Sequence, residues 1–414
     1  MVDSCGAEVL KALQQPRSQE ELFTLLLQAG VAEEWIRYVF PDFLRQLESA
    51  GLIQSQEGGN SNPRVSRRGG KDLRVLYLHL TERCDLACSY CYFVPTAREG
   101  RHLPVEVAQK ALEEARELGA SHIVVTGGEP LLHPGCFAIL VHARKHGFFV
   151  ELLTNGQAIT AEMAQKLRKL CQRVTVSLDS ANPTIHDKHR GQGTHARAVQ
   201  TVRLLKEAGV PEVAVTAVIT KDNQDEPAQV FRAFAKGLGA DKVSRQVYVA
   251  QGDERDQLLM PDLARFVERL EGELEAQLQA GVYWDGEKRL IWRNHCGAGR
   301  GVLAVGADGK VYPCQALTRP EFIAGDLHEH TLREIYQDAP VLQRLRALTV
   351  DALEPCRRCP YRYLCGGGCR ALAFNTSGFL EAPLPAGYCA LQRLLCELTL
   401  WQHALSQLAE KQKE

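Results

Sequence analysis

The sequence predicts an α/β protein built on a parallel sheet, with a small helical unit before the sheet and a cysteine-rich region after it. Short β-branched segments alternate with helix-like segments from residue 73 to about residue 280, and this alternation then stops. Six strand–helix repeats of this kind predict parallel strands joined by crossover helices. The expected strands are 74–80, 122–126, 148–153, 173–178, 212–219 and 243–249, and the expected helices are 104–118, 136–146, 161–171, 195–208, 226–238 and 261–279.

In such folds the ligand lies at the carboxyl ends of the strands, so the loops after the first four strands should meet at one edge. Spacing alone leaves a doubly wound open sheet as an alternative to a barrel. After about residue 281, glycine and cysteine become frequent, and a last helix is expected at 389–411. A region with little apolar periodicity needs another source of stability, which metal clusters can supply.

The bulk composition is that of a globular protein free in water. The chain has 414 residues, a net charge of −1, 45% apolar residues and 24% charged residues. This length predicts two to four domains. The charge gives no indication of nucleic acid or an anionic membrane as a partner. We find neither a membrane-length apolar run nor a signal peptide, and we therefore expect a cytoplasmic protein with no membrane partner.

The first 55 or so residues suggest a winged-helix unit, in the order helix, helix, helix, strand. Ser18 and Glu21 have the spacing of a capping box, and Leu22, Leu25 and Leu26 follow on one helix face. A further helical stretch runs from Trp35 to Leu47, and 52–53 should begin a strand. The polar, glycine-rich stretch 57–70 is interpreted as a wing tip or linker.

Charge argues against DNA binding by this unit. Residues 1–70 contain seven Lys or Arg and nine Asp or Glu, which gives a net charge of −2. A duplex-binding protein needs a basic face to neutralise phosphates. The segment that would contact bases carries Asp42, Arg45 and Glu48. The basic residues 64, 67, 68 and 71 belong to the expected linker, so we expect no nucleic-acid partner.

Cysteine is the unusual feature of the composition. Of the 14 cysteines, three lie at 84–91 and seven at 296–389, whereas those at 5, 136, 171 and 396 are isolated and are interpreted as packing residues. In a reducing cytosol, clustered cysteines indicate metal binding rather than disulfides. Cys84, Cys88 and Cys91 can hold three corners of a [4Fe–4S] cluster and leave one iron open, as in a catalytic site. A zinc site with a distant fourth ligand is the alternative.

The CxxxCxxC spacing followed by an aromatic residue resembles the radical S-adenosylmethionine (SAM) superfamily, and further motifs follow in the expected order over about 74–250. The resemblance implies a partial (β/α)6 TIM barrel, open on one side. It also implies that a 5′-deoxyadenosyl radical, formed from SAM on the cluster, abstracts a substrate hydrogen. The residues implied in SAM binding are Tyr92, Gly127, Gly128, Glu129, Asn155, Ser177, Asp179 and Arg190.

The seven C-terminal cysteines resemble the SPASM domain of radical SAM enzymes, which carries two auxiliary [4Fe–4S] clusters. A zinc ribbon is the alternative. By position, the resemblance implies that Cys356, Cys359, Cys365 and Cys389 hold the distal cluster. Cys296, Cys314 and Cys369 would hold the nearer cluster, one thiolate short of four. Our hypothesis is an open iron that binds a substrate thiolate, a preferred soft ligand; His295 is the alternative ligand.

The segment from Glu8 to Ile53 resembles the RiPP recognition element, which binds the leader of a ribosomally made precursor peptide by adding a strand to a sheet edge. We therefore expect a peptide maturase that forms a cysteine thioether, with a flavodoxin- or ferredoxin-type electron donor. Three alternatives are carbon–carbon cross-linking, a dehydrogenase similar to anaerobic sulfatase maturases, and a redox regulator. The expected domains are 1–70 (winged helix and linker), 71–280 (barrel) and 281–414 (SPASM and last helix). The sequence identifies no general base.

Overall fold

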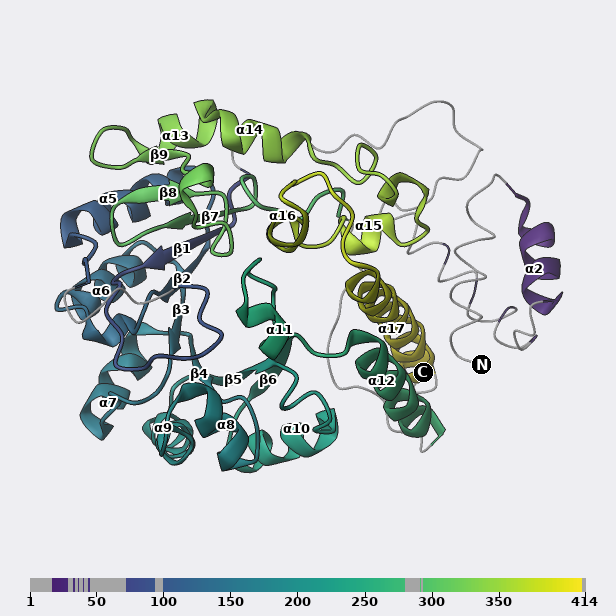
Figure 1. Ribbon diagram of the computed structural model, residues 1–414, viewed down its shortest axis with the longest axis horizontal. Helices are drawn as coiled ribbons and strands as arrows, with labels where there is room; N and C mark the ends of the chain where they lie inside the picture. Colours follow the sequence, from purple (N-terminus) through teal and green to yellow (C-terminus); the bar gives the residue numbers. More distant parts are fainter. Residues whose placement is uncertain are drawn as a thin grey trace. The chain divides into compact units, whose positions relative to one another are not determined.

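The computed structural model of the chain (Figure 1) describes residues 17–28, 33, 36, 40, 44, 72–93, 100–279, 291 and 293–411. Contacts divide the chain into two compact units. The first, called the sheet unit, contains the described residues of 68–262 and 297–347. The second, called the helical unit, contains those of 1–67, 263–296 and 348–414. Each unit is described by itself.

The sheet unit contains six parallel strands in sequential order, as Figure 1 shows. This order means that every crossover moves to the next strand in the same direction. A doubly wound sheet reverses its direction at a switch point, so that alternative does not hold. The strands are β1 (Val75–His79), β2 (His122–Thr126), β3 (Phe149–Thr154), β4 (Arg173–Ser177), β5 (Glu212–Ile219) and β6 (Lys242–Val247).

Three short strands extend this sheet beyond β1. β7 (Val302–Val305) pairs in parallel with β1, and β8 (Lys310–Tyr312) and β9 (Gly325–Asp326) continue antiparallel. They lie in the stretch where the sequence pattern predicts no further alternation. With two to four residues each, they are too short to show a period of two.

Helices cover one face of the sheet, and the main core lies between them and the strands (Figure 1). Alternate strand residues such as Leu76, Leu78, Val150 and Leu152 are fully buried there, as the two-residue period of a strand requires. The crossover helices are α5 (Val105–Glu117), α6 (Cys136–Lys145), α7 (Ala161–Leu170), α8 (Pro183–Arg190), α9 (Thr194–Ala208) and α10 (Ala228–Gly237).

The expected strands and crossover helices are confirmed, with ends that differ by one or two residues. Several short helices are not among the elements expected from the sequence. They include α8, η1 (Pro130–Leu132), α11 (Arg255–Leu259), α13 (Leu332–Asp338) and α14 (Pro340–Ala347). Each of these has eight residues or fewer, which gives a helical period little room to repeat.

The helical unit contains α12 (Leu263–Gln279) and α17 (Ala386–Lys411), which pack against each other. Their contact is close because Gly387 has no side chain: a Cβ there would lie 2.7 Å from the Cβ of Leu263. Between them in sequence lie η3 (Cys356–Arg358), α15 (Arg362–Cys365) and α16 (Arg370–Ser377). The expected last helix is confirmed and begins three residues earlier than predicted.

The capping box at the start of α2 (Gln19–Gln28) is confirmed. The Glu21 amide donates to Ser18 Oγ at 3.1 Å, and the Ser18 amide donates to Glu21 Oε2 at 2.8 Å. Leu22 and Leu26 are buried, as are the separately described helical positions 36, 40 and 44. Outside the described residues lie Cys5, the expected strand at 52–53, the linker 57–70 and its basic residues. The winged-helix assignment stays a prediction.

Over the part of the chain that the structure describes, no helix has both the length and the apolar character needed to cross a membrane.

Candidate active site

The loop that follows β1 carries the first three clustered cysteines. Cys84, Cys88 and Cys91 are all half-buried on it, and the Cys91 amide donates to the Cys88 carbonyl at 3.1 Å. Burial raises the pKa of the Cys84 thiol to about 12 and that of Cys91 to about 11, and it also raises the pKa of Cys88. The charge of Cys88 raises the pKa of both neighbouring thiols further. These thiolates are therefore disfavoured unless a metal supplies positive charge.

The loop after β2 lies against the cysteine loop, backbone to backbone. The Gly128 amide donates to the Thr81 carbonyl at 2.7 Å, and the Glu129 amide donates to the Arg83 carbonyl at 2.8 Å. A Cβ on Gly128 would lie 2.2 Å from the Arg83 carbonyl oxygen, and Gly127 has a φ of +142°. Only glycines permit this approach, so the glycine pair sets how closely the two loops pack.

The Glu129 carboxylate is completely buried and joins the loops after β2 and β3. It accepts from the Asn155 amide at 2.9 Å, from the Leu131 amide at 3.2 Å and from Thr154 Oγ1 at 3.0 Å. Burial raises the pKa of Glu129 to about 7, although these hydrogen bonds act in the opposite direction. The side chain therefore organises the strand ends.

Asn155, directly after β3, connects this loop to the cysteine loop. Its Nδ2 donates to Asp85 Oδ1 at 2.6 Å and lies 3.8 Å from Cys84 Sγ. Its Oδ1 accepts from the Gln157 amide at 2.9 Å, which fixes the orientation of the amide group. The loops after β1, β2 and β3 thus meet at one edge, as the parallel order predicts.

A buried ion pair lies at the end of β4. Arg190 Nε donates to Asp179 Oδ2 at 2.6 Å, and Arg190 Nη2 lies 3.2 Å from Oδ1. Tyr90 of the cysteine loop donates its hydroxyl to the same carboxylate, and the Val218 amide donates to Oδ1 at 3.1 Å. Burial alone would raise the pKa of Asp179, but the charge of Arg190 outweighs it and the net shift is downward. Asp179 is therefore ionised.

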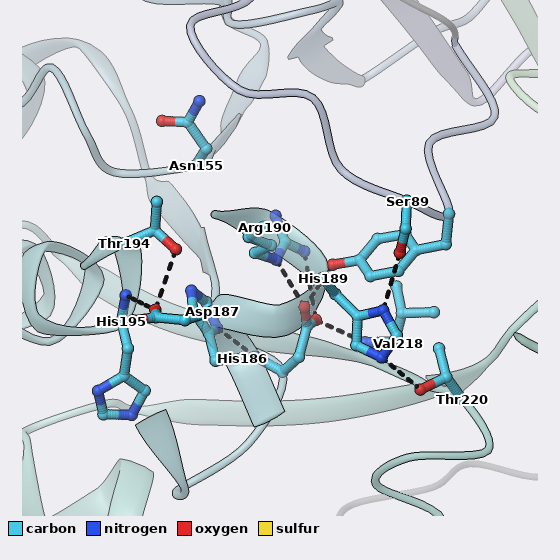
Figure 2. Close-up of polar contacts among 12 residues, drawn as sticks. Ser89, Asn155, His186, Asp187, His189, Arg190, Thr194, His195, Val218 and Thr220 are labelled. Carbon is cyan, nitrogen blue, oxygen red and sulfur yellow. Dashed lines mark hydrogen bonds and ion pairs between the residues drawn. The ribbon is translucent and has the colours of Figure 1, made fainter. Parts of the chain in front are cut away.

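Helix α8 also contacts the cysteine loop, through His189 and Ser89 (Figure 2). Ser89 Oγ lies 2.8 Å from His189 Nδ1, and Thr220 Oγ1 lies 3.1 Å from His189 Nε2. The Asp179 amide donates to His186 Nδ1 at 3.1 Å, while burial lowers the pKa of His186 to about 4. That imidazole is therefore neutral near pH 7, with Nδ1 as the acceptor.

The structure brings together the predicted residues of all four loops, but not in equal exposure. Glu129, Asp179 and Arg190 are buried and bonded within the protein, whereas Ser177 is half-buried and Tyr92 is 42% exposed. The sequence analysis did not single out Tyr90, Ser89 or His189, which join the cysteine loop to Asp179 and α8. The position of Tyr90 inside the cysteine motif was the available signal.

The helical unit brings four C-terminal cysteines into electrostatic contact. The pKa of Cys356 is raised by burial and by the charges of Cys359 and Cys389. The pKa of Cys365 is raised by burial and by the charges of Cys356 and Cys359. These are the four residues expected to hold the distal cluster. Cys396, interpreted as a packing residue, is buried nearby, and Cys365 and Cys359 contribute to its raised pKa.

Three consecutive glycines connect Cys365 to Cys369. Gly366, Gly367 and Gly368 have φ values of +71°, +83° and +69°, a left-handed conformation that costs most other residues about 1–2 kcal/mol each. Arg370, which is 2% exposed, follows this turn. Its guanidinium donates to the carbonyls of Leu380, Ala382 and Gly367 and lowers the pKa of Cys356.

The three cysteines expected to hold the nearer cluster belong to both units. Cys296 is exposed and Cys369 caps the start of α16 in the helical unit. Cys314 follows β8 in the sheet unit, where its charge contributes to raising the pKa of Tyr77. Their common role as ligands, like the roles of the other predicted site residues, stays a prediction.

Comparison with known proteins identifies the family. The radical SAM superfamily model matches residues 78–234, and the SPASM iron–sulfur cluster-binding domain model matches residues 296–360. The AdoMet-dependent heme synthase of Methanosarcina barkeri is 30% identical over 340 residues, which cover 74% of this chain and 94% of that protein. The chain belongs to the radical SAM superfamily.

Other relatives match a similar share of the chain. The PqqA peptide cyclase of Streptomyces rochei is 30% identical over 78% of this chain and 92% of its own length. The mycofactocin maturase MftC of Mycobacterium ulcerans is 29% identical over 74% of this chain and 85% of its own length.

Solved structures share this radical SAM fold at lower identity. Streptococcus suis SuiB bound to S-adenosylmethionine has a TM-score of 0.62 at 16% identity and covers 92% of this chain and 86% of that one. The structure of anSMEcpe with bound AdoMet has a TM-score of 0.64 at 19% identity. The match covers 81% of this chain and 98% of anSMEcpe. Both confirm an α/β fold with a parallel-sheet core.

The protein is a radical SAM enzyme that uses AdoMet and several [4Fe–4S] clusters. The cysteine loop fits the catalytic cluster, since it presents three soft donors whose raised thiol pKa values require a cation. The cysteines of the helical unit form a matching donor set for an auxiliary cluster.

Proposed function

We propose that this radical SAM enzyme is a maturase of a ribosomally synthesised peptide. The observation that carries the proposal is that relatives named for peptide maturation or cyclisation match about three quarters of the chain, in addition to the radical SAM and SPASM models that match it. SuiB, which has the same fold, has been crystallised with its precursor peptide SuiA. The substrate of this chain is accordingly a precursor peptide.

Each loop of the sheet unit has a task in this reaction. Cys84, Cys88 and Cys91 hold the catalytic cluster, and the glycine pair at 127–128 keeps the neighbouring loop close to it. Tyr92, Gly127, Gly128, Glu129, Asn155, Ser177, Asp179 and Arg190 form or support the AdoMet site. When bound, AdoMet and the reduced cluster supply the radical chemistry that breaks an unactivated C–H bond.

The N-terminal region binds the leader peptide in this proposal. The capped helix α2 and the buried apolar positions 22, 26, 36, 40 and 44 support a folded unit here. A leader strand added to its sheet edge would give affinity through backbone hydrogen bonds. Binding measured with a labelled leader peptide, for the full chain and for a chain lacking residues 1–70, tests this assignment.

The product is a thioether between a substrate cysteine and a carbon from which hydrogen was abstracted. Cys356, Cys359, Cys365 and Cys389 hold the distal cluster, and Cys296, Cys314 and Cys369 hold the nearer one. The missing fourth thiolate is the substrate cysteine. A flavodoxin- or ferredoxin-type protein supplies the electron for AdoMet cleavage.

The first test is iron and sulfide content with Mössbauer spectra on anaerobically reconstituted protein. We expect about twelve irons in three cubane clusters. The Cys84→Ala/Cys88→Ala/Cys91→Ala variant should lose about four irons and all AdoMet cleavage with dithionite, whereas Cys171→Ala, a buried helix-end cysteine, should keep both. Zinc in place of the C-terminal iron would remove the auxiliary clusters and the thioether mechanism with them.

Mass spectrometry of the peptide product tests the bond. A thioether removes two hydrogens and one alkylatable thiol, whereas a carbon–carbon cross-link removes two hydrogens and keeps every thiol. A carbonyl that reacts with hydrazine would instead indicate a dehydrogenase of the sulfatase-maturase type. The test substrate would be a short cysteine-containing peptide whose reading frame neighbours that of this chain.

A second candidate function is modification of a tetrapyrrole, because the heme synthase of M. barkeri is as similar to this chain as the peptide enzymes are. AdoMet cleavage that is stimulated by a porphyrin carboxylate and not by any precursor peptide would favour this candidate. Stimulation by the peptide alone would favour the maturase.

A further inference from the structure

Outside the cysteine sites, two histidines and one glutamate converge between α5 and α6 of the sheet unit. His142 lies on α6 and His146, one turn further along, caps the C-terminal end of this helix, while Glu113 lies on the neighbouring helix α5. Each offers one ligand atom, and the three atoms lie within 4.8 Å of one another. Among the described residues, it is the one group of three His, Cys, Asp or Glu side chains whose ligand atoms come this close together.

We propose that Glu113, His142 and His146 form a binding site for a divalent transition-metal ion, with Zn²⁺ as the first candidate. Two imidazole nitrogens and a carboxylate oxygen are a common zinc donor set, with water completing the tetrahedron. Cu²⁺, Ni²⁺ and Co²⁺ bind the same nitrogen and oxygen donors. This site is separate from the iron–sulfur sites and goes beyond the proposed function.

The distances within the group suit a metal ion. His142 Nε2 lies 3.1 Å from Glu113 Oε1, and the two imidazole centroids are 4.3 Å apart. A tetrahedral zinc ion with bonds of about 2 Å keeps its ligand atoms about 3.3 Å apart. The observed group therefore needs only small side-chain rotations to close around an ion.

The second ring nitrogen of His146 is fixed in the way that metal-binding histidines require. His146 Nδ1 lies 3.0 Å from the carbonyl oxygen of His142 and donates to it. In the neutral ring, this leaves Nε2 unprotonated and free to bind an ion. A backbone carbonyl that accepts from the other ring nitrogen is the usual support for a histidine ligand.

The site is open to solvent, and no Lys or Arg among the described residues pairs with Glu113. The Glu113 side chain is 52% exposed and that of His142 is 18% exposed. Among the cations of α5 and α6, Lys110 pairs with Glu114, Arg116 and Arg144 donate to the carbonyls of Ala120 and Phe148, and Lys145 directly precedes His146. An incoming ion thus meets one negative charge and two imidazoles.

The position of the site indicates a structural role. His146 ends α6 three residues before β3 begins, so the group lies at the amino ends of the strands, opposite the cysteine loop. A metal ion there would clamp α5 to α6 and stabilise the folded state by mass action. It would not meet AdoMet or the substrate.

The test uses holoenzyme with its clusters reconstituted, so that the cysteines are occupied. Zn²⁺ titration by calorimetry should show one further equivalent and a raised thermal midpoint. His146→Ala should lose this binding, and Glu113→Gln should weaken it by about tenfold or more. His330→Ala, which removes an exposed histidine elsewhere, should bind as wild type does. All variants should keep the visible absorbance of the clusters and their AdoMet cleavage.

Co²⁺ as a probe identifies the donor atoms. We expect the visible bands of a nitrogen- and oxygen-bound ion without thiolate charge-transfer absorption. Equal Zn²⁺ binding in wild type and His146→Ala, or thiolate charge transfer in the wild-type Co²⁺ spectrum, would overturn the proposal. Failure of the peptide reaction leaves this readout unaffected, so the two proposals can fail separately.

Discussion

In the proposed function, the cysteine loop of the sheet unit and the cysteines of the helical unit bind clusters, and the two sets of cysteines have very different supports. The first loop follows a strand and is tied by backbone contacts to the glycine pair, by Tyr90 to a buried ion pair and by Ser89 to α8. The second set comes from short helices joined by a left-handed glycine turn and held by Arg370. The first set of cysteines is thus held by neighbouring loops and a helix, whereas we expect the second set to depend on its metal.

This difference matches two different roles of a cluster. A catalytic cluster with an open iron must be held in a rigid and preformed site. A fully ligated cluster can instead contribute directly to folding. We therefore expect loss of the first cluster to abolish activity and loss of the distal cluster to reduce stability.

The largest expected effect separates these roles. Cys356→Ala/Cys359→Ala should lower the anaerobic thermal midpoint of the helical unit by about 10 °C or more, since each kcal/mol moves a unit of this size by roughly 2–4 °C. Cys84→Ala/Cys88→Ala should abolish AdoMet cleavage with little change in either midpoint. Calorimetry and limited proteolysis would measure this. Equal destabilisation by both pairs would contradict the comparison.

The next effect tests the ion pair that supports the first loop. Asp179→Asn leaves the Arg190 charge buried without its partner, which costs about 3–5 kcal/mol. Urea unfolding should show this loss, and AdoMet affinity should fall because Tyr90 also loses its acceptor. Lys166→Ala breaks an exposed pair with Glu162 on α7 and serves as the control. The prediction fails if both substitutions leave stability unchanged.

The smallest effect concerns pH. The pKa of Glu129 is raised by burial from 4.5 to about 7, so the folded state binds a proton more tightly than the unfolded state. Stability from this group is complete below about pH 4.5 and is lost as pH rises towards 7, by about 3 kcal/mol in total. Glu129→Gln should remove this part of the pH dependence. If the free energy of unfolding varies with pH in the same way in the wild type and in Glu129→Gln, this prediction is wrong.

The sequence predicts the regular part of this molecule well. Strands β1 to β6 and their main helices follow a clear period, and parallel pairing then brings residues 84, 129, 155 and 179 to one edge. The strand order excludes the doubly wound sheet. It depends on tertiary packing, and the local sequence pattern does not predict it. Strands β7 to β9 are too short to carry a pattern.

The site is predicted less completely than the fold. Motif spacing singles out Asp179 and Arg190. It does not predict that these two residues form an ion pair, or that Tyr90 donates to the same carboxylate. Likewise Glu113 and the two histidines lie on different helices, so only their packing brings them together. Interactions between residues far apart in sequence are the part that local reasoning does not reach.

The pairing of β7 with β1 has a consequence for synthesis on the ribosome. Val75 pairs with Val302, so 227 residues separate the two partners. At about 5–20 residues per second, the free edge of β1 waits roughly 10–45 s for its partner after leaving the ribosome. An unpaired strand edge is a template for aggregation. Translation speed and chaperone supply should therefore affect the yield of this protein.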